Sequence, residues 1–164
     1  MSLLIGIDDT DMPGTRGTNQ LAREIVRRLA SDWTCLWIVR HQLFVDPRVP
    51  YTSQNGSASI AVAGPLDVPR IADVCRQAIH DWFIPGSDPG LCVAASADVS
   101  ADVVAYAHHC EREVVSQEQA HDVAGRTGLH LEGLGGTHGG VIGALAAVGL
   151  AREANSGRIV QWRD

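Results

Sequence analysis

Residues 4–22 decide the fold, and they read Leu-Ile-Gly-Ile-Asp-Asp-Thr-Asp-Met-Pro-Gly-Thr-Arg-Gly-Thr-Asn-Gln-Leu-Ala. A short apolar run ends abruptly in three carboxylates, Asp8, Asp9 and Asp11. A loop containing proline and glycine follows, and Thr18 then heads a helical pattern as its expected N-cap. The stretch predicts a strand, a loop and a helix. Its acidic side chains gather at the C-terminal end of the strand, where open α/β sheets bind ligands.

The three aspartates form the first candidate site. Carboxylates this close together repel one another unless a cation or a shared proton offsets their charge. Mg²⁺ prefers oxygen ligands and accompanies phosphate chemistry, so the pattern predicts a magnesium site at Asp8, Asp9 and Asp11. The alternative is that Asp9 or Asp11 caps a turn while Asp8 faces solvent.

Composition restricts the class of protein. The chain has 164 residues, 45% of them hydrophobic, which suits a single compact domain over residues 1–164. Its formal net charge of −6 argues against a basic nucleic-acid face over the whole molecule. All 13 basic residues are arginine, so a lysine nucleophile, a lysine Schiff base and a P-loop lysine are excluded.

Cysteine usage and hydropathy predict a cytoplasmic protein. The four cysteines form no Cys-x-x-Cys pair, which favours reduced thiols in or near a core over a zinc ribbon. We expect no signal peptide, because acidic residues begin at position 8. No membrane partner is expected either, since the longest apolar stretch, residues 141–151, is too short to span a bilayer.

Strand-like and helix-like segments alternate along the chain. Strands are expected at 3–7, 34–45 (as one long or two short), 57–63, 91–95, 128–132 and 158–162. Helices are expected at 18–30, 67–83, 100–111, 116–125 and 141–151. This order predicts an α/β or α+β protein with a mixed sheet and flanking helices. The apolar helix at 141–151 could also lie at the interface of a homodimer.

A glycine-rich loop before that apolar helix is the second candidate site. Glycine lets a backbone approach a ligand closely, and unpaired N–H groups at a helix N-terminus attract phosphate. The candidate nucleotide contacts are Gly135, Gly136, His138, Gly139 and Gly140. The loop is neither a Walker A motif nor a clean dinucleotide fingerprint. The alternative is a turn whose glycines permit tight helix packing.

A loop rich in proline, asparagine and glycine, residues 46–56, is the third candidate. Its two prolines and the pair Asn55-Gly56 favour an ordered loop, in which Arg48 is a candidate phosphate contact. An exposed connection with a solvated Arg48 is the alternative.

Taken together, these segments resemble the catalytic region of the archaeal tRNA-Ile 2-agmatinylcytidine synthetases. Residues 5–11, with Thr18 and Leu21-Ala22, resemble the family's Gly-Ile-Asp-Asp-Thr-Asp segment without a gap. Residues 46–56 and 135–147 are similar to two further segments of that family, in the same order and spacing. The resemblance spans nearly the whole chain.

The resemblance implies an unusual kinase chemistry. The family uses ATP and magnesium to phosphorylate the C2 carbonyl of a tRNA cytidine, and agmatine then displaces the phosphate. By this likeness Asp8, Asp9 and Asp11 would hold Mg²⁺ and the ATP phosphates, and Thr18 would match a threonine that receives the γ-phosphate. The glycine loop, Arg48 and Asn55 would lie near the nucleotide. The implied organisation is a kinase-like catalytic core with, as one option, a small ferredoxin-like subdomain over residues 57–98.

Departures from the family pattern leave three functions open. The family's Cys-Thr-Thr is Gly17-Thr18-Asn19 here, and Tyr51, Thr52 and Ser53 replace basic residues. We expect the OB-fold and zinc ribbon that grip tRNA to be missing. The first hypothesis is a Mg²⁺-dependent, ATP-binding phosphotransferase or ligase-like enzyme of unknown acceptor. The second is a non-catalytic module that binds nucleotide or a protein partner. The third is a tRNA modifier that relies on another subunit for RNA binding.

Overall fold

The structure is a computed structural model, and it describes residues 2–8, 17–44, 56–153 and 158–162. The first half of the chain contains β1 (Ser2–Asp8), α1 (Thr18–Leu29), β2 (Thr34–Gln42), β3 (Gly56–Ala63), α2 (Val68–Asp81) and β4 (Gly90–Ala95). The second half contains a 3₁₀ turn η1 (Ser96–Asp98), α3 (Ala101–Arg112), α4 (Gln117–Thr127), β5 (His130–Gly133), α5 (Val141–Glu153) and β6 (Arg158–Trp162). The predicted α+β class is confirmed, and β2 is one strand with an irregularity between Cys35 and Trp37.

The strands form one six-stranded sheet in the order β5-β4-β1-β3-β2-β6. Every strand pairing in the described residues is antiparallel, where a mixed sheet was predicted. The reason is that β3 lies between β1 and β2, and β1 lies between β3 and β4. The strands that α1 and α2 connect are therefore parallel to each other but never neighbours, which is the split βαβ arrangement of ferredoxin-like folds. A separate subdomain at residues 57–98 stays a prediction.

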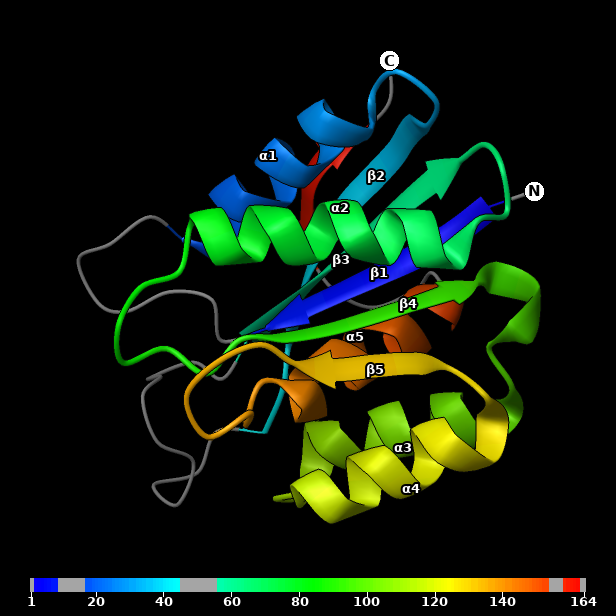
Figure 1. Ribbon diagram of the computed structural model, residues 1–164. Coiled ribbons are helices and arrows are strands. Elements are labelled where there is room, and N and C mark those ends of the chain that lie inside the picture. The colour runs from blue at the N-terminus through cyan, green and yellow to red at the C-terminus, as the bar shows by residue number, and fades with distance from the viewer. Residues whose placement is uncertain (1, 9–16, 45–55, 154–157, 163–164) are drawn as a thin grey trace.

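Helices cover both faces of this sheet (Figure 1). Side chains of β1 alternate between the faces, as a strand requires. Leu3, Ile5 and Ile7 join the core beneath α1 and α2, and Leu4 joins the core beneath α3, α4 and α5. Asp8 has the same parity as Leu4 and lies on the α5 face.

Helix α5 is apolar because the chain itself buries it. Its residues from Val141 to Ala151 are buried except for Ile142. Two glycines allow the close contacts: a Cβ at Gly6 would overlap the carbonyl of Ala144, and one at Gly149 would overlap α3. Burial within the chain explains the apolar sequence, so this helix gives no support to the proposed homodimer.

The four cysteines carry free thiols, three of them buried. No helix in the described part of the chain combines the length and the apolar character needed to cross a membrane.

Candidate functional site

Asp8 ends β1 and is buried, with 8% of its surface exposed. It lies directly opposite Ser57 of β3 and Gly90 of β4. Its carboxylate lies against the first turn of α5, because a Cβ at Gly143 would overlap Oδ2 of Asp8. The alternative in which Asp8 faces solvent is therefore wrong, and glycine at position 143 is what makes room for the carboxylate.

The carboxylate of Asp8 lies beside the first turn of α5. The N-terminal end of a helix carries a partial positive charge, and α5 presents this end to the carboxylate. Tyr106 lies nearby and donates its hydroxyl proton to the carbonyl of Ile142 at 2.9 Å. Burial raises the pKa of Tyr106, and it raises that of Cys110 to about 12; the negative charge of Asp8 adds smaller contributions to both. Both groups therefore stay protonated and neutral near Asp8.

Thr18 is the first residue of α1, and the N-cap is Gly17. The prediction of Thr18 as N-cap is therefore wrong by one position. The backbone explains the difference: Gly17 is extended, its carbonyl accepts the N–H groups of Gln20 and Leu21, and glycine is a tolerated N-cap. Thr18 itself is buried, with 4% exposed. It begins a helix that covers the face opposite to the carboxylate of Asp8.

The glycine loop before α5 packs against the protein's own atoms. Gly136 has a φ of +55°, and a Cβ there would overlap the carboxylate of Asp88. A Cβ at Gly140 would overlap the backbone of Asp88 and Gly90. The predicted close approaches are thus made to β4 and the turn before it, which supports the tight-packing alternative for these two glycines.

Backbone N–H groups in the second half of this loop are bonded within the protein. Thr137 donates to Oδ1 of Asp88 at 2.7 Å, and Gly140 donates to the Asp88 carbonyl at 2.7 Å. Four further N–H groups donate to loop acceptors, those of His138, Gly139, Val141 and Ile142. The expectation of unpaired N–H groups is therefore wrong for residues 137–142. Phosphate binding by the loop stays a prediction, and it would have to use other groups.

His138 is one of three consecutive exposed residues in the loop, Gly136 to His138. It has a φ of 66°, rare for a residue with a side chain, and its ring packs over Gly133. Its exposure leaves the imidazole free to meet a ligand. Gln117 of α4 donates to the neighbouring carbonyl of Thr137 at 2.9 Å, which ties this part of the loop to the helical layer.

Four predicted site residues lie outside the described residues, namely Asp9, Asp11, Arg48 and Asn55. Within the residues that the structure describes, no group of three or more His, Cys, Asp or Glu side chains is placed to hold a metal ion. The described part of the proposed magnesium site is therefore Asp8 alone.

Three residues near Asp8 were not predicted from sequence: Asp88, Ser57 and His41. Asp88 stands before Pro89 in a turn-like stretch, and this pattern was the only available signal. Nothing local indicates that its carboxylate reaches Thr137, which is 49 positions away. Strand pairing places Ser57 directly opposite Asp8, and His41 directly opposite Ser57.

Comparison with known proteins identifies a relative. No protein-family model matches the chain. The curated isoleucine-tRNA 2-agmatinylcytidine synthetase TiaS of Archaeoglobus fulgidus is 27% identical to it over 168 residues, which cover 99% of this chain and 39% of that protein. The crystal structure of apo TiaS superposes with a TM-score of 0.76 at 25% identity, over 91% of this chain and 35% of that one. The chain is homologous to TiaS.

TiaS has also been solved in complex with its isoleucine tRNA and ATP. This structure matches with a TM-score of 0.77 at 26% identity, covering 91% of our chain and 36% of the TiaS chain. The resemblance inferred from sequence is thus confirmed. The chain spans less than two fifths of the TiaS proteins that it matches.

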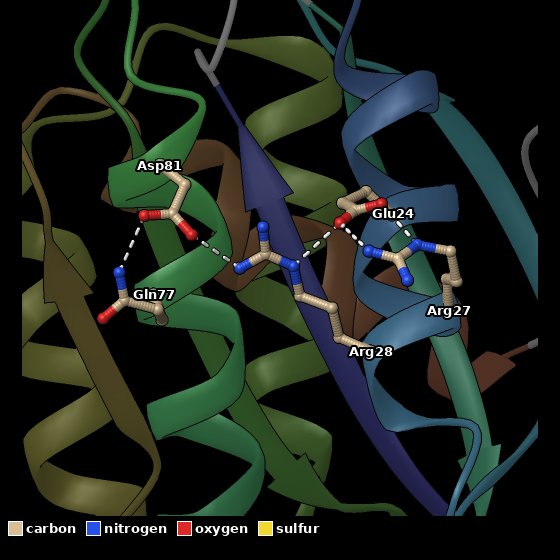
Figure 2. Close-up of polar contacts among 5 residues, drawn as sticks. All are labelled: Glu24, Arg27, Arg28, Gln77 and Asp81. Carbon is tan, nitrogen blue, oxygen red and sulfur yellow. Dashed lines mark hydrogen bonds and ion pairs between the residues drawn. The ribbon is translucent and has the colours of Figure 1, made fainter.

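Two arginines of α1, Arg27 and Arg28, are paired with carboxylates. Arg27 donates to both carboxylate oxygens of Glu24, at 2.8 and 2.7 Å, and Arg28 donates to Glu24 and to Asp81 of α2 (Figure 2). Hydrogen bonds first from Arg27 and then from Arg28 lower the pKa of Glu24 to about 2. These positive charges are therefore balanced locally, which weakens the idea of an arginine patch for RNA.

Proposed function

We propose that this chain is a Mg²⁺-dependent, ATP-binding domain of the phosphotransferase or ligase-like kind, with an acceptor still to be identified. The observation that carries the proposal is the homology to TiaS over nearly the whole chain, which includes the match to a complex of TiaS with tRNA and ATP. We place its action in the cytoplasm.

The residues at the end of β1 suit this proposal by their chemistry. Asp8, together with Asp9 and Asp11, would supply the oxygen ligands that Mg²⁺ prefers. The buried position of Asp8 against α5 fixes where its carboxylate lies. When bound, Mg·ATP supplies the phosphoryl group and the cation that neutralises its charge.

The glycine loop suits a nucleotide only in part. The N–H groups of residues 137–142 are already bonded, so a phosphate would meet exposed side chains there instead. His138 is the exposed ionisable group, and in this proposal it orients a phosphate or holds a proton beside it. Gly135 and Gly136 would shape the turn that presents it. Thr18 would be the phosphate acceptor that the resemblance implies.

Calorimetry of ATP binding, with and without Mg²⁺, tests the proposal. We expect binding that requires Mg²⁺ and is lost in Asp8→Asn and Asp11→Asn. Asp98→Asn serves as the matched control, because Asp98 is an exposed aspartate in η1. Absence of binding by the wild type, or equal binding by all three variants, would contradict the proposal.

A non-catalytic, nucleotide-binding or protein-binding module is the second candidate. The internally bonded loop and the change from the family's Cys-Thr-Thr to Gly17-Thr18-Asn19 favour it. Incubation with γ-labelled ATP separates the two functions. Label on Thr18, absent in Thr18→Ala, would establish phosphoryl transfer, whereas binding without transfer or hydrolysis would support the module.

A further inference from the structure

Three polar side chains form a row across adjacent strands beneath α5. Ser57 of β3 lies directly opposite Asp8 of β1 on one side and His41 of β2 on the other. Directly opposite residues in antiparallel strands share a face, with Cβ atoms roughly 4.5–5.5 Å apart. The row therefore places Ser57 between the carboxylate of Asp8 and the imidazole of His41.

Two members of the row carry buried atoms without a hydrogen-bond partner. Ser57 is 1% exposed and His41 is 2% exposed. His41 Nε2 lies 2.7 Å from the hydroxyl of Ser59, but His41 Nδ1 and the hydroxyl oxygen of Ser57 have no partner in the described structure. A buried polar atom left unpaired costs about 1–3 kcal/mol, so each of these two atoms lowers the stability of the fold.

The chemistry of the row is directional. Burial lowers the pKa of His41 to about 4, so the imidazole is neutral near pH 7 and one ring nitrogen donates while the other accepts. If the Ser59 hydroxyl donates to Nε2, then Nδ1 carries the proton and is a hydrogen-bond donor that needs an acceptor. The hydroxyl oxygen of Ser57 can accept a hydrogen bond from Nδ1–H, and the hydroxyl group can donate one to a carboxylate.

We propose that Ser57 and His41 are positioning residues for Asp8. In this arrangement Ser59 donates to His41, and bridging water molecules connect His41 Nδ1–H to the Ser57 hydroxyl and the Ser57 hydroxyl to the carboxylate of Asp8, because neither Nδ1 nor that hydroxyl has a direct partner. The row adds no charge, and it would fix the orientation of Asp8 from the neighbouring strand β3. Its link to metal binding rests on the proposed function, whereas the row itself does not.

Nuclear magnetic resonance of the His41 ring tests the row without metal or nucleotide. We expect Asp8→Asn to shift the His41 Nδ1 resonance, and the same change made in a Ser57→Ala background to leave it unmoved. His41→Gln assigns the signal, and Ser96→Ala is the matched serine control at the far end of the sheet. The proposal would be overturned if Asp8→Asn left the His41 resonance unchanged, or if it shifted the resonance equally in the Ser57→Ala background.

Metal affinity supplies the second measurement. Partners that orient a metal ligand typically change metal affinity 10–100-fold when removed, so we expect Ser57→Ala to weaken Mg²⁺-dependent ATP binding about tenfold or more. Ser57→Thr, which keeps the hydroxyl, should retain it. A merely structural Ser57 would give unchanged binding, because deleting an unpaired buried hydroxyl is neutral or stabilising.

The two measurements separate the two proposals. If the wild type binds no Mg·ATP, the proposed function fails, and the His41 resonance still decides whether the row exists. If Mg·ATP binds and Ser57→Ala binds it equally well, the positioning role fails and the proposed function stands. Melting temperature, measured for each variant, shows that loss of binding does not come from unfolding.

Discussion

At the scale of single residues, the candidate site combines a buried carboxylate, Asp8, with a buried imidazole, His41. Asp8 stays next to a helix N-terminus, where a negative charge is stabilised. Burial disfavours the imidazolium of His41 and lowers the pKa of this residue. The two residues lie two strands apart, so one end of the sheet combines a buried carboxylate with a neutral histidine.

Burial of His41 predicts acid sensitivity of the fold. Its pKa falls from the ordinary 6.5 to about 4, so between these values the unfolded chain binds a proton that the folded chain does not. The protonation of His41 therefore costs no stability above about pH 6.5. As the pH falls to about 4, it lowers the free energy of unfolding by roughly 3 kcal/mol. Urea unfolding over this pH range should show the decline in the wild type and a smaller one in His41→Gln.

His108 is a control of opposite sign for that measurement. Hydrogen bonds to Glu111, and then to Glu153, raise its pKa. Its contribution is present at low pH and is lost as the pH rises through the folded pKa. Replacing His108 by Gln should therefore lower the free energy of unfolding by a constant amount below about pH 6.5 and leave the slope of the decline between pH 6.5 and 4 unchanged. Equal pH dependence of the wild type and His41→Gln would contradict our account of His41.

At the scale of elements, the positions of helices and strands could be predicted from sequence, but the order of the strands could not. Hydrophobic periodicity is local, so it located β3 at residues 57–63 and α1 at 18–30 to within a residue. Strand order is not local: β1 pairs with β3 and β4, which lie far along the chain, and no periodicity encodes that choice. The mixed sheet was predicted for this reason, and the antiparallel one is found.

The candidate site divides in the same way. Asp8 at a strand end follows from a local pattern, whereas only the order of the strands places Ser57 opposite Asp8 and His41 opposite Ser57. The glycine loop is also ambiguous in sequence, because a missing side chain can make room for a ligand or for the protein. Here the carboxylate of Asp88 and the backbone of Gly90 occupy that room.

Gly143 of α5 offers a test at this scale. A Cβ at this position would overlap the carboxylate of Asp8, so Gly143→Ala should displace α5 or Asp8 and destabilise the fold by about 1–3 kcal/mol. Gly125 of α4 is the matched control, since a Cβ there meets nothing within 4 Å. Gly125→Ala should stabilise the chain by up to about 1 kcal/mol through helix propensity. Urea unfolding measures both changes, and equal effects of the two substitutions would contradict the close contact between the Asp8 carboxylate and Gly143.

At the scale of the whole molecule, charge is distributed as paired ions over an acidic background. The net charge is −6, and arginines of α1 and α2 bond to carboxylates: Arg28 to Glu24 and Asp81, and Arg76 to Glu132 and Asp73. Such pairs leave little long-range positive potential, because each guanidinium is offset within a few ångströms. A whole-surface attraction for the phosphates of RNA is therefore not expected.

This distribution predicts weak tRNA binding by the isolated chain. At about 0.15 M salt we expect no affinity tighter than the non-specific range of roughly 10⁻⁴–10⁻⁶ M, with a shallow dependence on salt. Glu24→Gln should raise the affinity and steepen the salt dependence, because it releases Arg27 and part of the bonding of Arg28 (Figure 2). Filter binding with tRNA across a salt series measures both quantities, with Glu118→Gln on the outer helix α4 as the charge-matched control. Tight binding by the wild type with a steep salt slope would instead favour a tRNA modifier that recognises its substrate unaided, since paired arginines cannot supply that slope.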